Sequence, residues 1–103
     1  MTLQEMQEDI QFQMSKMTHP ASIAHTVCGL SEEAGEVAGL LKRQVHKGQP
    51  VPLERWVDEL GDVLWYLVAA ASCLGVSMDE VYEYNRAKLE VRYGFPGQTK
   101  PER

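Results

Sequence analysis

The sequence has few of the features expected of a nucleic-acid-binding, membrane-spanning or secreted protein. It carries 10 Lys and Arg residues against 15 Asp and Glu residues, a formal net charge of −5. Binding to a nucleic-acid backbone depends on clustered cations, so this shortage argues against a nucleic-acid partner. The longest uncharged apolar run, residues 63–74, is shorter than the roughly 20 residues needed to cross a bilayer. The acidic N-terminus lacks a basic segment followed by an apolar core, so we expect no secretory signal and a cytoplasmic location.

Cysteine and proline are also scarce. The two cysteines, Cys28 and Cys73, fall within apolar helical patterns. In a reducing compartment we expect each to be a small buried thiol, not half of a disulfide. All five prolines lie in connectors or in the C-terminal tail. At 103 residues the chain has room for one domain only.

Apolar residues spaced three and four apart predict an all-α fold with four helices, at residues 3–17, 20–45, 53–74 and 78–92. The third helix should end at Gly75, a residue suited to a left-handed C-terminal cap. Ser77 and Glu80 have the form of a capping box for the fourth helix. Residues 94–103 are polar and contain two prolines, so we expect a single domain over residues 1–93 followed by a flexible tail.

The third helix indicates self-association. Over residues 63–74 it is apolar on nearly every side, and such a helix must be covered on every side. Small residues within it, Ala69, Ala70, Ala71 and Ser72, would let another helix approach closely. We therefore expect a homo-oligomer, a dimer or a tetramer, in which the second and third helices form an intersubunit helix bundle.

Two acidic pairs stand out within these apolar helices. Glu33 and Glu36 lie three residues apart on the second helix, and Glu59 and Asp62 do so on the third, so each pair projects from one side. A short connector makes the helices antiparallel neighbours and can bring the pairs face to face. Four converging carboxylates repel one another unless a cation is present. Mg²⁺ or Mn²⁺ fits such hard oxygen ligands, although acids of this kind also occur on solvated faces.

The residues of these pairs resemble a known family. EEAGE at residues 32–36, followed after 22 residues by ELGDVLWYL at residues 59–67, is similar to the EExxE and ExxD signature of MazG-type nucleotide pyrophosphohydrolases, of the all-α NTP pyrophosphatase superfamily. The resemblance spans residues 19–93. It implies an all-α oligomer that uses Mg²⁺, with Mn²⁺ as a substitute, to hydrolyse a nucleoside triphosphate to the monophosphate and pyrophosphate. It also assigns the site residues, with Glu32 and Glu33 at the catalytic centre, Glu32 as the candidate for activating water, and the metal held by Glu33, Glu36, Glu59 and Asp62.

Contacts to the substrate phosphates are expected from the fourth helix. Asn85, Lys88 and Arg92 recur at three and four residues and so share a side of this helix. The resemblance, through the pattern of Asn85, Lys88 and Leu89, implies that Asn85 and Lys88 contact phosphate. The alternative is that Lys88 and Arg92 belong to a solvated stripe.

The base of the nucleotide needs an aromatic or amide partner. Tyr66 lies one helical turn past Asp62 on the same side, whereas Trp56 and Trp65 are expected to point elsewhere. His19 resembles a position that lines the base pocket in related pyrophosphatases, and Gln13 could supply amide hydrogen bonds. A role in the core or in a turn is the alternative for each of these residues.

Three functions therefore remain open from the sequence. The first is a nucleoside triphosphate pyrophosphohydrolase. The second is an enzyme like the phosphoribosyl-ATP pyrophosphohydrolase of histidine synthesis, and the third is a non-catalytic helical interaction module. Base and sugar preference is not determined by the sequence.

Overall fold

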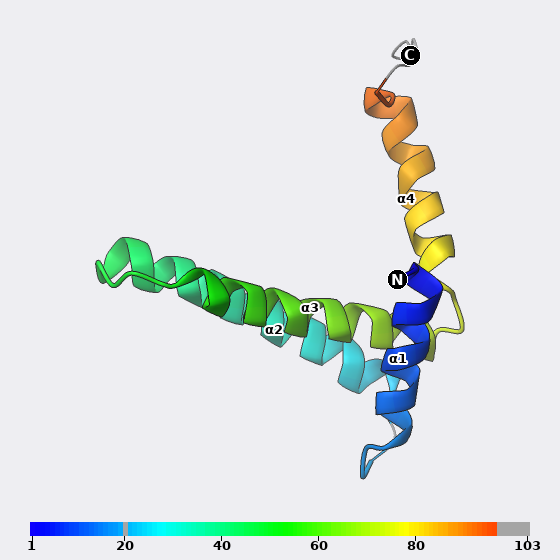
Figure 1. Cartoon of the computed structure of the whole chain (residues 1–103), viewed down its shortest axis with the longest axis horizontal. Coiled ribbons are helices and arrows are strands. Elements are labelled where there is room, and N and C mark those ends of the chain that lie inside the picture. Colours follow the sequence, from blue (N-terminus) through cyan, green and yellow to red (C-terminus); the bar gives the residue numbers. More distant parts are fainter. Residues whose placement is uncertain (20, 97–103) are drawn as a thin grey trace.

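Four α-helices form the computed structural model, which describes residues 1–19 and 21–96 (Figure 1). They are α1 (Leu3–Ser15), α2 (Ile23–His46), α3 (Leu53–Cys73) and α4 (Met78–Tyr93), and no strand occurs among the described residues. The expected all-α class and the order of four helices are confirmed.

Side-chain caps explain where the helices begin. The Thr2 hydroxyl accepts a hydrogen bond from the Glu5 N–H, and the Glu5 carboxylate accepts one from the Thr2 N–H, a complete capping box for α1. The Ser22 hydroxyl accepts from the His25 N–H at 3.1 Å, so α2 begins at Ile23. The expected start at residue 20 was wrong, because the serine cap and not the proline sets this boundary. Pro20 itself lies outside the described residues.

The predicted boundary between the last two helices agrees with the structure. Gly75, with φ of 75°, follows the end of α3 in the left-handed conformation. The Ser77 hydroxyl accepts from the Glu80 N–H at 3.1 Å and caps α4. α1, by contrast, ends at Ser15, two residues before its predicted end. Of the expected tail, residues 97–103 lie outside the described part, and the Phe95 ring packs against the Arg86 guanidinium at 4.1 Å.

The long antiparallel hairpin of α2 and α3 is the backbone of the fold (Figure 1). α1 crosses the C-terminal part of α3, and α4 turns away from α3 by 102°. The core lies at this crossing, where α1, α3 and the start of α4 contribute Ile10, Val68, Ala69, Ala71 and Met78. Ala69 and Ala71, two of the small residues of α3, therefore pack against α1 of the same chain. The expected intersubunit bundle stays a prediction.

A buried glutamine fixes α1 against the turn between α3 and α4. The Gln7 amide nitrogen donates to Ser72 Oγ at 3.1 Å and to the Val76 carbonyl at 3.0 Å, and its oxygen accepts from the Met78 N–H at 2.8 Å. Every polar atom of this side chain is thus paired, as a buried amide requires. These three bonds hold α1 against the last turn of α3, the turn after it and the start of α4.

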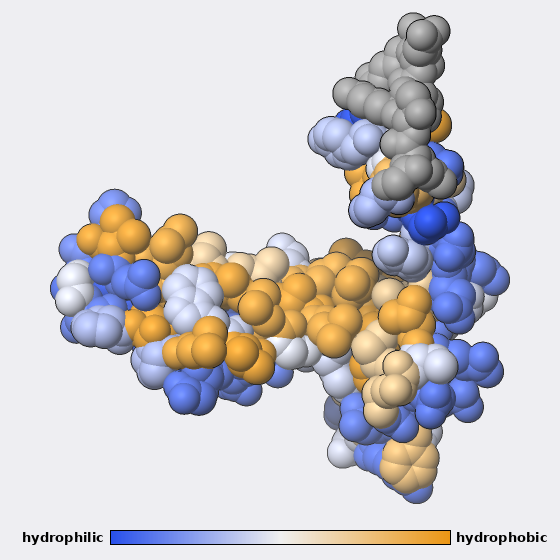
Figure 2. Space-filling model, turned by 45° about the horizontal axis from the view of Figure 1, so that its top comes forward, coloured by the Kyte–Doolittle hydropathy of each residue, from blue (hydrophilic) through white to orange (hydrophobic). Residues whose placement is uncertain are grey.

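One side of the hairpin remains apolar and exposed. Its α3 residues alternate at spacings of three and four over most of the helix and are 38–74% exposed: Leu53, Val57, Leu60, Leu64, Leu67 and Leu74. Figure 2 shows apolar side chains along the length of this hairpin. Spacings of three and four in alternation are typical of a helix seam that packs against other helices.

The cysteines and the membrane prediction can also be compared with the structure. Both thiols are free; Cys73 is half-buried, but Cys28 is exposed, so its expected burial was wrong. Within residues 1–19 and 21–96, no single helix is long and apolar enough to span a bilayer, and the α3–α4 pair that reaches this length and composition together is sharply bent.

Candidate active site

Three of the predicted carboxylates converge between α2 and α3. Glu33 of α2 and Glu59 and Asp62 of α3 each place a carboxylate oxygen within 4.8 Å of the other two, and we call these residues the carboxylate cluster. The antiparallel pairing of the helices brings them together, as the motif spacing predicts. Glu32 and Glu36 are exposed on α2 and lie outside this three-residue group.

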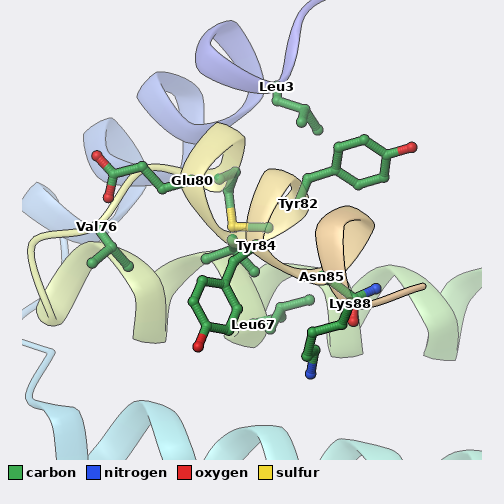
Figure 3. Close-up of a pocket in the computed structure, with 10 residues that line it drawn as sticks. Leu3, Leu67, Val76, Glu80, Tyr82, Tyr84, Asn85 and Lys88 are labelled. Carbon is green, nitrogen blue, oxygen red and sulfur yellow. The ribbon is translucent and has the colours of Figure 1, made fainter. Parts of the chain in front are cut away.

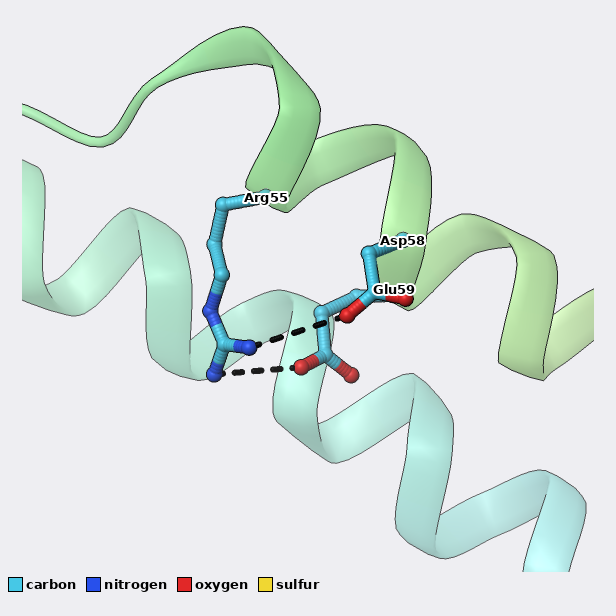
Figure 4. Close-up of polar contacts among 3 residues, drawn as sticks. All are labelled: Arg55, Asp58 and Glu59. Carbon is cyan, nitrogen blue, oxygen red and sulfur yellow. Dashed lines mark ion pairs between the residues drawn. The ribbon is translucent and has the colours of Figure 1, made fainter.

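Arg55 neutralises one member of the cluster. Its Nη2 lies 3.2 Å from Glu59 Oε1, and its Nη1 lies 3.7 Å from Asp58 Oδ2 (Figure 4). The Glu59 side chain is only 8% exposed, so its charge needs a compensating partner. Arg55 stands four residues before Glu59, and the sequence already contained this signal because such pairs meet on one side of a helix.

The remaining charges of the cluster repel one another. Desolvation, and then repulsion from the Asp62, Glu59, Glu36 and Glu32 carboxylates, raises the pKa of Glu33 above its ordinary value. All donor atoms of the cluster are carboxylate oxygens at mutual distances that one ion can bridge. This donor set fits a hard divalent cation such as Mg²⁺ or Mn²⁺.

A pocket of about 510 Å³ opens beside the cluster. We call it the aromatic pocket, and its lining residues are Gln13, Met17, Glu33, Asp62, Trp65 and Tyr66. Gln13 and Tyr66, two of the predicted base contacts, lie in this lining together with two members of the cluster. A ligand in the pocket would therefore have both carboxylates and aromatic rings within its walls.

Trp65 also lines the aromatic pocket, and the expectation that it points elsewhere was wrong. Its indole nitrogen donates to Gln13 Oε1 at 2.7 Å. The side of α3 that carries Trp65 is the side that α1 crosses, and this crossing could not be derived from the periodicity of α3 alone. Met17 was predicted only as an apolar residue of the first helix, and no sequence signal placed it here.

The Tyr66 ring packs closely on α2. A Cβ atom at Gly29 would overlap the ring, with Tyr66 Cζ only 2.7 Å away, so a glycine is needed there for the ring to fit. The ring also makes edge contacts with Trp65 and His25, at centroid distances of 5.2 and 6.1 Å. Tyr66 thus belongs both to the α2–α3 interface and to the pocket wall.

The other predicted contacts lie elsewhere in the chain. His19 is exposed in the turn after α1 and is not among the residues lining the aromatic pocket. Asn85 and Lys88 line a separate, mainly apolar pocket of about 700 Å³ between α4 and α3, together with Leu67 (Figure 3). The Arg92 guanidinium lies over the Tyr93 ring at 5.9 Å. Within one chain, α4 therefore does not bring these side chains to the carboxylate cluster.

Comparison with known proteins agrees with this arrangement. A family model described as the MazG nucleotide pyrophosphohydrolase domain matches residues 21–94, which include the whole carboxylate cluster. The chain belongs to this MazG family. The resemblance drawn from the EExxE and ExxD motifs is thereby confirmed.

Individual relatives and solved structures extend the comparison. The chain is 34% identical over 74 residues to the Gene 37 protein of Mycobacterium phage L5, covering 68% of this chain and 65% of that protein's length. The crystal structure of iMazG from Vibrio DAT 722 matches with a TM-score of 0.63 and 27% identity over 92% of this chain and all of that one. The Bacillus-conserved MazG protein, a nucleotide pyrophosphohydrolase, has the same fold, with a TM-score of 0.73 and 22% identity over 89% of this chain and 93% of that one.

Proposed function

We propose that this MazG domain hydrolyses nucleoside triphosphates to the monophosphate and pyrophosphate with Mg²⁺, for which Mn²⁺ can substitute. The observation that supports the proposal most directly is that two members of the carboxylate cluster, Glu33 and Asp62, lie in the wall of the aromatic pocket. A nucleotide needs both kinds of partner, because its phosphates need a cation and its base needs an aromatic or amide group.

Each carboxylate has a role in this reaction. Glu33, Glu59 and Asp62 would hold the ion, and the family resemblance adds Glu36, one turn further along α2. When bound, Mg²⁺ supplies positive charge that offsets the phosphates and polarises the α-phosphate. Arg55 would orient Glu59 through the ion pair at 3.2 Å, which leaves the second carboxylate oxygen available as a ligand.

Hydrolysis requires one water and one proton acceptor. The water oxygen bonds to the α-phosphorus, the bond from that phosphorus to the α–β bridging oxygen breaks, and pyrophosphate leaves with the electron pair. The proton of the water passes to a carboxylate, and we assign this step to Glu32, which is exposed next to Glu33 and outside the cluster.

The phosphate contacts of α4 require a second copy of the chain. Asn85, Lys88 and Arg92 lie away from the carboxylate cluster of their own chain, while one side of the α2–α3 hairpin is apolar and exposed. We propose a homo-oligomer, a dimer or a tetramer, in which these hairpin sides pack together and α4 of one chain reaches the site of another. This arrangement would also cover the exposed leucines of α3.

Pyrophosphate release tests the reaction. Canonical nucleoside triphosphates and phosphoribosyl-ATP are each incubated with the protein and Mg²⁺, and then with EDTA. We expect release from the triphosphates with Mg²⁺ and none with EDTA or with Asp62→Asn, which removes a ligand charge at constant volume. Release from phosphoribosyl-ATP alone would favour an enzyme like phosphoribosyl-ATP pyrophosphohydrolase. No release from any nucleotide would favour the non-catalytic helical interaction module.

A mixing experiment tests the shared site. Asp62→Asn and Lys88→Ala chains are each expected to be inactive, because one lacks a metal ligand and the other a phosphate contact. After unfolding and refolding together, mixed oligomers would contain one site with both residues intact, and activity should return in part. If each variant stays inactive in the mixture, the two residues act within one chain.

A further inference from the structure

The hydrogen bond between Trp65 and Gln13 fixes the orientation of an amide in the aromatic pocket. An indole N–H can only donate, so the atom of Gln13 that lies 2.7 Å from it must be the amide oxygen and not the nitrogen. The orientation of the Gln13 amide therefore follows from chemistry. It does not depend on a choice between two similar atoms.

The nitrogen of the Gln13 amide is left available on an exposed residue of the pocket lining. With its oxygen bound to Trp65, Gln13 has only its two N–H donors left, and within residues 1–19 and 21–96 no acceptor bonds them. Gln13 lines the pocket together with Trp65 and Tyr66, in the same wall as Glu33 and Asp62 of the cluster. The hydrogen bonds of Gln7, less than two helical turns earlier, hold α1 in place. The backbone of Gln13 therefore stays beside the pocket.

We propose that Trp65 locks the Gln13 amide as a hydrogen-bond donor, and that this donor selects nucleotides whose base has a carbonyl oxygen, not an amino group, at pyrimidine position 4 or purine position 6. The inference rests on the proposed function and adds its substrate class. Gln13 contacts the base directly, and Trp65 acts as a positioning residue through Gln13.

The physical reason is the mismatch of two donors. A carbonyl oxygen accepts from the Gln13 amide, whereas an amino group at the same position would face it donor to donor, so no hydrogen bond forms between them. The net gain from one neutral hydrogen bond is modest, and at the exposed Gln13 water partly replaces a lost partner. We therefore expect a preference of about threefold to tenfold in kcat/KM, since tenfold corresponds to about 1.4 kcal/mol.

The test compares substrates that differ at this one group. The ratios of kcat/KM are measured with Mg²⁺ for dUTP against dCTP and for dITP against dATP. The unmodified protein should favour dUTP and dITP. Equal constants within each pair, or a preference for the amino bases, would overturn the inference and leave the proposed function intact. No hydrolysis of any of the four would overturn the proposed function and the inference together.

Two variants examine the lock and the donor separately. Gln13→Glu replaces the donor by an acceptor of similar volume, so the preference should invert towards dCTP and dATP. Trp65→Phe removes the N–H that fixes the amide, so Gln13 can turn either way and the ratio should fall towards one. A purely structural role for either residue would lower activity on both members of a pair equally and leave the ratio unchanged, which would overturn the inference.

The chain offers matched controls for both changes. Trp56→Phe removes the other tryptophan, which lies outside the aromatic pocket, and Gln4→Glu places the same new charge on an exposed position of α1. Both should keep the base preference of the unmodified protein. The Trp56→Phe protein also leaves Trp65 as the sole tryptophan, so quenching of its fluorescence reports nucleotide binding independently of turnover. Binding in that assay should follow the same order of bases.

Discussion

Replacement of Gly29 by alanine should destabilise the protein although alanine is the better helix former. Gly29 is buried on α2, and the Cβ of an alanine would overlap the Tyr66 ring, whose Cζ lies 2.7 Å from that position. The ring cannot shift freely, because its edges already contact Trp65 and His25. Gly29→Ala should therefore push Tyr66 out of its position in both the α2–α3 interface and the aromatic pocket.

The magnitude follows from two opposing effects. Alanine in a helix interior stabilises by up to about 1 kcal/mol relative to glycine. Forcing extra atoms into a packed site costs typically about 1–3 kcal/mol. Gly39 lies on the same helix with no atom within 4 Å of a built Cβ, so Gly39→Ala gains the first effect without the second. The two variants should differ in unfolding free energy by about 1–3 kcal/mol, with Gly29→Ala the less stable.

Thermal unfolding at one fixed protein concentration measures this difference. For a domain of this size about 1 kcal/mol corresponds to roughly 4–8 °C in Tm, so the two melting curves should be clearly separated. A fixed concentration is needed because association would also shift Tm. If Gly29→Ala melts at or above the temperature of Gly39→Ala, the close contact between Gly29 and Tyr66 does not limit the packing and the reasoning fails.

Three further predictions concern the carboxylate cluster. Mg²⁺ at millimolar concentration should raise Tm and EDTA should reverse the rise, because the ion binds the folded cluster and not the unfolded chain; an unchanged Tm would argue against a metal site. Because the pKa of Glu33 is raised in the folded protein, its contribution to stability is fully present below its ordinary pKa of 4.5 and is lost as the pH rises through the raised value. Without metal, Glu33→Gln should therefore melt higher than the unmodified protein at pH 7 and close to it at pH 4. Arg55→Gln leaves the buried Glu59 carboxylate without its partner and should lower the free energy of unfolding by about 1 kcal/mol without metal, given that Arg55 is 43% exposed. The loss should be smaller with Mg²⁺. An equal loss with and without the ion would show that Arg55 does not act on the metal site.

The sequence by itself determined the features that depend on local periodicity. Apolar residues at spacings of three and four placed the four helices, and Gly75 and Ser77 marked the boundary between the last two. The acidic pairs were readable for the same reason, because residues three apart on a helix always share a side. An antiparallel hairpin was then sufficient to bring Glu33, Glu59 and Asp62 together.

Only the tertiary structure decided which sides of the helices meet. The crossing of α1 over α3 placed Trp65 against Gln13 and covered the small residues of α3, and helical spacing carries no information about that crossing angle. The contact between Gly29 and Tyr66 likewise depends on the distance between α2 and α3. The turn of α4 away from α3 places Asn85 and Lys88 far from the carboxylate cluster of the same chain. Their shared side of α4 was predictable from their spacing, but its direction was not. A repeat of three and four residues fixes a face within one helix, whereas the partner of that face is chosen by contacts between residues far apart in the sequence.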